Sequence, residues 1–207
     1  MSDFTCQGEI KGVVRPRRSI IAFDQSLTKT GVACLTAARS GIRVHTTLIT
    51  PPANLNGLPR LEWWWFTFDN VIKASAARVT VMEGYSMSSK FQTHQSGELG
   101  AVLKLVVSRS PGDSVQAFSQ ITPGCHKKLT TGNGGAKKSQ TMLELHRRFG
   151  LYIPQEDVAD AVSLALCAWA ADLPDPSETG LPKGHLEALK KVHLLSRETG
   201  FTVDKRS

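Results

Sequence analysis

Two short apolar runs, each followed by an acidic residue, restrict the folds available to this chain. Residues 20–23 (IIAF) precede Asp24, and residues 79–82 (VTVM) precede Glu83. Runs that are apolar at consecutive positions are typical of strands buried on both faces, in a sheet with helices on each side. Functional sites in such sheets gather at the carboxyl ends of the strands. If the two strands are neighbours, about 4.8 Å apart, their terminal acids lie close enough to share one or two cations.

Two further acids open an apolar helix. Asp157 and Asp160 fall in residues 154–170 (PQEDVADAVSLALCAWA), where Pro154 suits a helix start. Their spacing of three residues places both on one side of that helix, and the helix dipole favours their ionised forms. Taken one at a time, each of these four acids would be interpreted as an ordinary cap or turn residue. Together they are costly to bury without a neutralising cation, so they indicate a divalent metal site.

The rest of the chain predicts one α/β domain. The apolar periodicity predicts strands at about 19–24, 30–36, 42–49, 78–83 and 114–118, and helices at about 58–76, 93–109, 137–149 and 157–171. This order matches a ribonuclease H-like, mixed five-stranded sheet flanked by helices. We expect residues 1–18 to form an irregular basic arm, residues 19–172 the domain, and residues 173–207 a linker and basic tail.

Composition narrows the class of partner. The chain has 25 Lys and Arg against 18 Asp and Glu, which gives a net charge of +7. This excess of positive charge predicts a polyanionic binding partner such as nucleic acid. No stretch approaches the roughly 20 apolar residues of a membrane span, and the N-terminus lacks the apolar core of a signal peptide. The four cysteines are scattered, without a C-x-x-C pair, which indicates reduced thiols. We therefore expect a cytoplasmic protein without a membrane partner or a small-molecule cofactor.

Four blocks of the sequence, in order, resemble the RuvC family of Holliday junction resolvases, in a divergent form like those encoded by bacteriophages. The blocks are residues 20–33 (IIAFDQSLTKTGVA), 79–89 (VTVMEGYSMSS), 123–141 (PGCHKKLTTGNGGAKKSQT) and 156–167 (EDVADAVSLALC). The third and fourth blocks together are the most specific. The resemblance spans about residues 19–171 and implies a nuclease domain.

The resemblance also implies roles for individual residues. The metal carboxylates are Asp24, Glu83, Asp157 and Asp160, holding two Mg²⁺ ions for which Mn²⁺ substitutes. Lys127 and Lys138 contact DNA near the scissile phosphate, and Lys138 also neutralises charge that develops on it. Lys128 and Lys137, with Lys127 and Lys138, bracket a glycine loop, which favours a phosphate-binding site over a solvated helix end. Gly132 and Gly134 would let the backbone approach phosphate closely. The family's junction-wedging aromatic position is Ser86 here. Either neighbour, Tyr85 or Met87, could serve in its place, and we assign DNA contact to Tyr85. His126 and His146 are expected at the surface or on DNA.

The expected function is a structure-specific endonuclease that resolves four-way junctions by paired symmetric nicks. Two nicks imply a homodimer, and the resemblance makes the apolar helix after residue 93 the candidate interface. A second interpretation is a nuclease for flaps and forks. A third is an actin-like ATP-binding domain, whose phosphate loop also has Asp followed by Thr-Gly. A fourth is a DNA-structure binder without catalysis.

Overall fold

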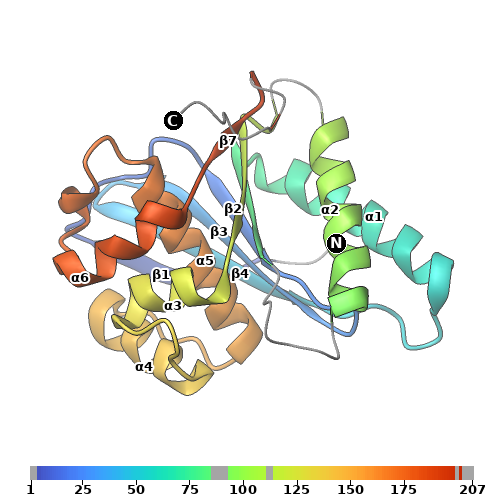
Figure 1. The fold of residues 1–207 in the computed structure, drawn as a ribbon, viewed down its shortest axis with the longest axis horizontal. Coiled ribbons are helices and arrows are strands. Elements are labelled where there is room, and N and C mark those ends of the chain that lie inside the picture. Colours follow the sequence, from blue (N-terminus) through green and yellow to red (C-terminus); the bar gives the residue numbers. More distant parts are fainter. Residues whose placement is uncertain (1–3, 85–92, 111–113, 199–200, 202–207) are drawn as a thin grey trace.

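A mixed sheet with helices on both faces forms the body of the protein in a computed structural model, which describes residues 4–84, 93–110, 114–198 and 201 (Figure 1). In spatial order the strands are β1 (Thr5–Lys11), β4 (Gly41–Ile49), β3 (Thr30–Ala38), β2 (Ile20–Asp24), β5 (Val79–Glu83), β6 (Ala117–Ile121) and β7 (Leu195–Ser196). The strands β2, β5 and β6 run parallel, and the other pairs are antiparallel. The prediction of a mixed sheet with flanking helices is confirmed.

The sheet has seven strands, so the predicted count of five was wrong. The strand β1 lies in the expected irregular arm and pairs with β4, while β7 lies in the expected tail and pairs with β6. In β1 only Ile10 is buried, and β7 has two residues, both half-buried. Edge strands of this kind are fixed by backbone pairing, so they lack the apolar run by which a central strand is recognised.

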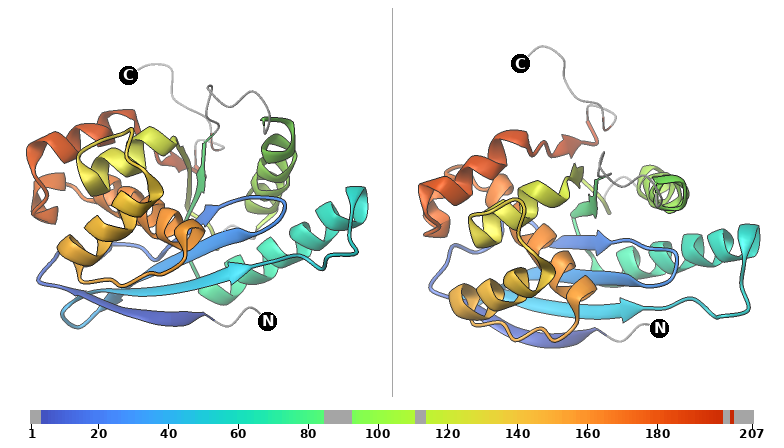
Figure 2. Two further views of the ribbon diagram at one scale, coloured as in Figure 1. Left: turned by 90° about the horizontal axis from the view of Figure 1, so that it is seen from below. Right: turned by 60° about the horizontal axis from the view of Figure 1, so that its bottom comes forward.

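The consecutive apolar residues of β2 serve two separate cores. Ile20 and Ala22 belong to the core on the side of α3 (Pro123–Thr131), α4 (Lys138–Phe149) and α5 (Glu156–Asp172). Ile21 and Phe23 belong to the core under α1 (Gly57–Ser75) and α2 (Thr93–Arg109). Figure 2 shows from two directions that these two groups of helices stay on opposite sides of the sheet. The alternation of a strand therefore makes every position in this run apolar.

The helix α5 lies at the centre of the first core. Every residue from Val158 to Ala170 is buried, because the helix packs on the sheet and is covered by α3 and α4. The sequence analysis did not predict α3, although Pro123 occupies the first turn of that helix and Gly132 ends it at a φ of 82°. Lys127 and Lys128 lie within this helix, ahead of the glycines that they were predicted to bracket.

The segment after α5 packs against the domain rather than serving only as a linker. It contains η1 (Pro176–Thr179), α6 (Lys183–Leu186) and η2 (Glu187–Lys191), and Ala188 and Val192 join the first core. Beyond β7, Arg197 donates to the carbonyl oxygens of Val107 and Ser110 at the end of α2 (3.2 and 2.7 Å). In the described part of the chain, no helix is long and apolar enough to cross a membrane.

Candidate metal and nuclease site

The ends of two neighbouring strands bring the first two acids together. In the parallel pair of β2 and β5, Phe23 lies opposite Met82, so Asp24 and Glu83 are the next residues on each strand. The side chain of Gln25 then joins the two strands. Its Nε2 donates to the Glu83 carbonyl oxygen (2.7 Å), and its Oε1 accepts from the Glu83 N–H (3.1 Å). Gln25, which the sequence analysis did not single out, fixes the backbone of Glu83.

We expect Gln25→Leu to lower the free energy of unfolding by about 2 kcal/mol, because it leaves the N–H and C=O of Glu83 without their partner. Urea denaturation measures this loss. Gln116→Leu, at an exposed glutamine just before β6, is the matched control and should change the stability little. Equal stability of the two variants would show that the Gln25 bridge is unimportant.

The other two acids reach the same place through a contact of α5 with β3. Gly31 pairs with Asp24 across the strands, and a Cβ atom built on Gly31 would lie 2.1 Å from the Asp157 carbonyl oxygen. Real side chains do not tolerate this separation, so only glycine lets the first turn of α5 rest on β3. That contact places Asp157 and Asp160 beside the end of β2.

The electrostatics show that the acids are close to one another. Burial raises the pKa of Asp24 well above its usual range, and the charges of Glu83 and Asp160 raise it further. Burial also raises the pKa of Asp160, which is 3% exposed, and the charges of His126 and Lys138 act against this shift. The four predicted carboxylates therefore form one acidic group at the end of β2.

Two lysines partly balance this group at Asp157. Lys138 and Lys29 each place Nζ 2.8 Å from one oxygen of the Asp157 carboxylate, and Lys138 also lies 3.8 Å from Asp160. Burial raises the pKa of Asp157, but the hydrogen bonds from Lys138 and Lys29 outweigh it and hold the pKa below its usual value. The sequence analysis missed Lys29; its signal was a basic residue in the turn leading to Gly31.

The remaining basic residues assigned to DNA differ in position. The charge of Lys127 lowers the pKa of Asp160, so this lysine acts on the acidic group electrostatically. Lys128 instead pairs with Glu187 of η2 (2.8 Å), and Lys137 is exposed at the start of α4. Tyr85 lies outside the described residues.

The two glycines of the basic block have contacts within the protein. Gly132 has a φ of 82° and closes α3, and a Cβ there would lie 2.8 Å from Nε2 of His185. A Cβ on Gly134 would lie 2.9 Å from the carbonyl oxygen of Gly124. Both glycines therefore allow close packing of this block, whether or not it also contacts phosphate.

His126 is buried, so its expected place at the surface or on DNA was wrong. It is 0% exposed, and its Nε2 lies 3.2 Å from Oε1 of Glu83. The cause is α3, which turns this position of the basic block toward α5 and the sheet. His146, in contrast, is exposed on α4, with its ring edge-on to Tyr152.

The chemistry of these residues fits a divalent cation, although their side chains are not arranged as a complete set of ligands. Among the described residues, no three Asp, Glu, His or Cys side chains are arranged as a ready set of metal ligands. The buried Oδ1 of Asp160 nevertheless has no hydrogen-bond partner, and Asp24 carries a repulsion that a cation would relieve. Carboxylate oxygens are the ligands that Mg²⁺ and Mn²⁺ prefer.

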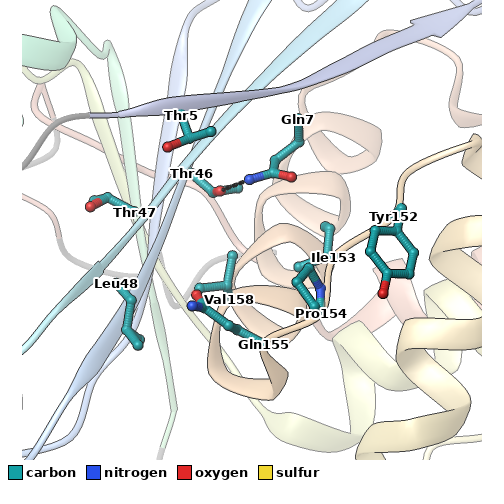
Figure 3. Close-up of a pocket in the computed structure, with 10 residues that line it drawn as sticks. All are labelled: Thr5, Gln7, Thr46, Thr47, Leu48, Tyr152, Ile153, Pro154, Gln155 and Val158. Carbon is teal, nitrogen blue, oxygen red and sulfur yellow. Dashed lines mark hydrogen bonds between the residues drawn. The ribbon is translucent and has the colours of Figure 1, made fainter.

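A separate hollow of about 450 Å³ lies between β1, β4 and the segment leading into α5 (Figure 3). Uncharged side chains line it, and the amide of Gln7 donates to the hydroxyl of Thr46 across it (2.8 Å). None of the predicted site residues contributes to this lining. The chemistry of the acidic group is therefore located outside this hollow.

Comparison with known proteins defines the class of fold. No family model and no curated protein matches the chain. Among solved structures, it is similar to Thermus thermophilus RuvC, with a TM-score of 0.61 and 16% identity over 74% of this chain and 95% of that one. For T. thermophilus RuvC in complex with a Holliday junction substrate, the TM-score is 0.63 at 16% identity, covering 75% and 96%. The chain thus has the ribonuclease H-like fold, in the form found in RuvC.

Proposed function

We propose that this protein is a divergent, bacteriophage-type relative of RuvC, a structure-specific DNA endonuclease that resolves four-way junctions by paired symmetric nicks. Residues 19–172 form its nuclease domain, and it acts in the cytoplasm. The observation that carries the proposal is the acidic group of Asp24, Glu83, Asp157 and Asp160 with its adjacent lysines, on a fold that in T. thermophilus RuvC is solved with Holliday junction substrate.

The proposed chemistry is hydrolysis of a phosphodiester bond in a site that holds two Mg²⁺ or Mn²⁺ ions. Such ions, when bound, supply an activated water and stabilise the leaving 3′-oxygen. Asp24 would bridge them, with Glu83 and Asp160 completing the ligand sets. Asp157 is already bonded to Lys29 and Lys138, so it would act directly or through water while it holds Lys138 beside the other acids.

Lys138 has a second proposed role at the scissile phosphate. Burial lowers its pKa, but the hydrogen bond to Asp157 and the charges of Asp24 and Asp160 outweigh this and raise the pKa above the usual value. The ammonium group is therefore charged at neutral pH. From this position it would neutralise negative charge that builds up on the phosphate during attack.

The proposed DNA contacts follow the excess of positive charge around the acids. The charge of Lys127 acts on Asp160, and Lys137 is exposed at the start of α4, so both suit phosphate contacts beside the cut. Lys128 is held by Glu187 and would reach DNA only by exchanging that partner. Gly132 and Gly134, and Tyr85, complete the proposed set.

Paired nicks require two copies of the site, which we propose are supplied by a homodimer with two-fold symmetry. The helices α1 and α2 carry large exposed apolar side chains on the face of the sheet away from α5. Leu58 and Phe66 of α1 are 74% and 65% exposed, and Leu105 of α2 is 48% exposed. The helix α2 is the proposed centre of the interface.

Cleavage of labelled branched DNA tests this function. We expect the protein with Mg²⁺ to introduce two symmetric nicks into a four-way junction, to cut a fork of the same arm sequences at least about tenfold more slowly, and to lose activity in EDTA. Mapping the cut positions on all four strands measures the symmetry. Equal cleavage rates on junctions, forks and flaps would contradict junction resolution and would indicate a general nuclease for branched DNA. Nucleotide binding without DNA binding would favour the ATP-binding interpretation.

A further inference from the structure

We propose that His126 is a positioning residue that orients the Glu83 carboxylate for binding the divalent cation. This inference rests on the proposed metal-dependent nuclease site. It concerns a residue outside the four carboxylates and the lysines, and it follows from the geometry around α3.

The imidazole ring of His126 joins Glu83 to the interior of the protein. Its Nε2 lies 3.2 Å from Oε1 of Glu83, and its Nδ1 lies 3.0 Å from Oγ of Ser163 on α5. The same Ser163 oxygen lies 2.7 Å from Oγ1 of Thr130 on α3. All three supporting side chains, those of His126, Ser163 and Thr130, are fully buried, whereas the side chain of Glu83 is 25% exposed.

The direction of the contact with Glu83 follows from its chemistry. An ionised carboxylate only accepts hydrogen bonds, so Nε2 of His126 must carry a proton and donate it toward Oε1. Ser163 holds the other ring nitrogen, and the hydroxyl of Ser163 is itself held by Thr130 and by the His126 carbonyl oxygen (3.0 Å). The ring therefore cannot rotate without breaking several buried hydrogen bonds.

The position of His126 suits an orienting role more than a purely structural one. The buried ring lies between the carboxylate of Glu83 and the hydroxyl of Ser163. By holding Oε1 of Glu83, it limits how the partly exposed carboxylate can turn at the end of β5. Groups that orient metal ligands in this way typically change metal affinity about 10–100-fold when they are removed.

Binding of Mn²⁺ to the DNA-free protein, followed by isothermal titration calorimetry, tests the proposal with three substitutions. His126→Leu removes both hydrogen bonds and should weaken Mn²⁺ binding about 10–100-fold. His126→Asn can keep a hydrogen bond with Ser163 but does not reach Glu83, so it should bind Mn²⁺ as weakly as the leucine variant. His126→Gln can place an amide N–H toward Glu83 and should restore most of the affinity.

His185 provides the matched control, because it is a second buried histidine whose Nδ1 bonds the Leu129 carbonyl oxygen (2.7 Å), without contact to an acid. His185→Leu should lower the melting temperature and leave Mn²⁺ affinity unchanged. Wild-type affinity in His126→Leu, or equal affinities of the Asn and Gln variants, would overturn the positioning role while leaving the nuclease proposal intact. Absence of Mn²⁺ binding by the wild-type protein would overturn both.

Discussion

Asp24→Asn should reduce junction cleavage on the order of 1,000-fold or more while junction binding is retained. Asp24 lies among the other acids at the end of β2, and the proposed site uses its carboxylate to bridge both cations. Asparagine keeps the shape of the side chain but removes the charge that would hold the cations. Single-turnover cleavage measures the loss, and a gel-shift assay in EDTA measures binding.

The same substitution should stabilise the metal-free protein. Because the pKa of Asp24 is raised in the folded state, the folded protein binds more protons than the unfolded one between the two pKa values, and its stability falls as pH rises through that window. Asparagine does not ionise, so the variant does not lose stability in this way as the pH rises. We therefore expect a higher melting temperature for Asp24→Asn at pH 7 without metal, by about 2–4 °C for each kcal/mol gained. The difference should shrink as the pH falls toward the unfolded-state pKa of about 4, and below that pH it should be lost.

Asp172→Asn is the control for this pair of effects. Asp172 is a largely buried acid at the end of α5, and it is bonded to Arg18 away from the site. Its substitution should lower stability by breaking that pair and should leave the cleavage rate within about twofold of wild type. Equal cutting by wild type and Asp24→Asn would remove Asp24 from the mechanism.

Gly31→Ala should unfold or severely destabilise the protein and abolish cleavage in any molecules that remain folded. The new Cβ would lie 2.1 Å from the Asp157 carbonyl oxygen and 2.8 Å from the Val158 nitrogen, so α5 must move away from β3. Backbone cannot yield as a flexible side chain can, so we expect a loss of at least about 3 kcal/mol. Thermal unfolding should show a melting temperature lowered by about 6–12 °C or more.

Gly184→Ala gives the matched comparison for Gly31→Ala. No atom lies within 4 Å of a Cβ built on Gly184, which is exposed in α6. It should change the melting temperature by no more than about 2 °C. A Gly31→Ala protein with wild-type stability and activity would show that α5 does not depend on this close contact to place Asp157 and Asp160.

The sequence predicted the central elements because burial determines their residues. The strands β2 and β5 contact a core on each face, so their residues are apolar at consecutive positions and the acids that follow mark their ends. The acids of α5 were recognisable for the same reason. The number of strands was not predictable in this way, because β1 is polar and β7 is short.

The parts of the site that the sequence did not reveal depend on contacts between distant residues. Gln25 and His126 act through hydrogen bonds to Glu83, and no local pattern distinguishes a glutamine or histidine that meets a partner about 40 to 60 residues away. The helix α3 was not predicted because it is short, with nine residues, and carries too few apolar side chains to show a helical period. Lys29 had only a weak signal, a basic side chain in a polar turn.

The hydrogen bonds of Arg197 link the C-terminal segment of the chain to the helix proposed to form the dimer interface. This residue follows β7 and holds the last carbonyl groups of α2, the helix at the centre of the proposed dimer interface. A protein shortened before Leu195 would lose both the edge strand and this anchor. The helix α2 would then be attached to the sheet less firmly. Truncation at the C-terminus would therefore weaken the proposed contact between two subunits as well as the chain end.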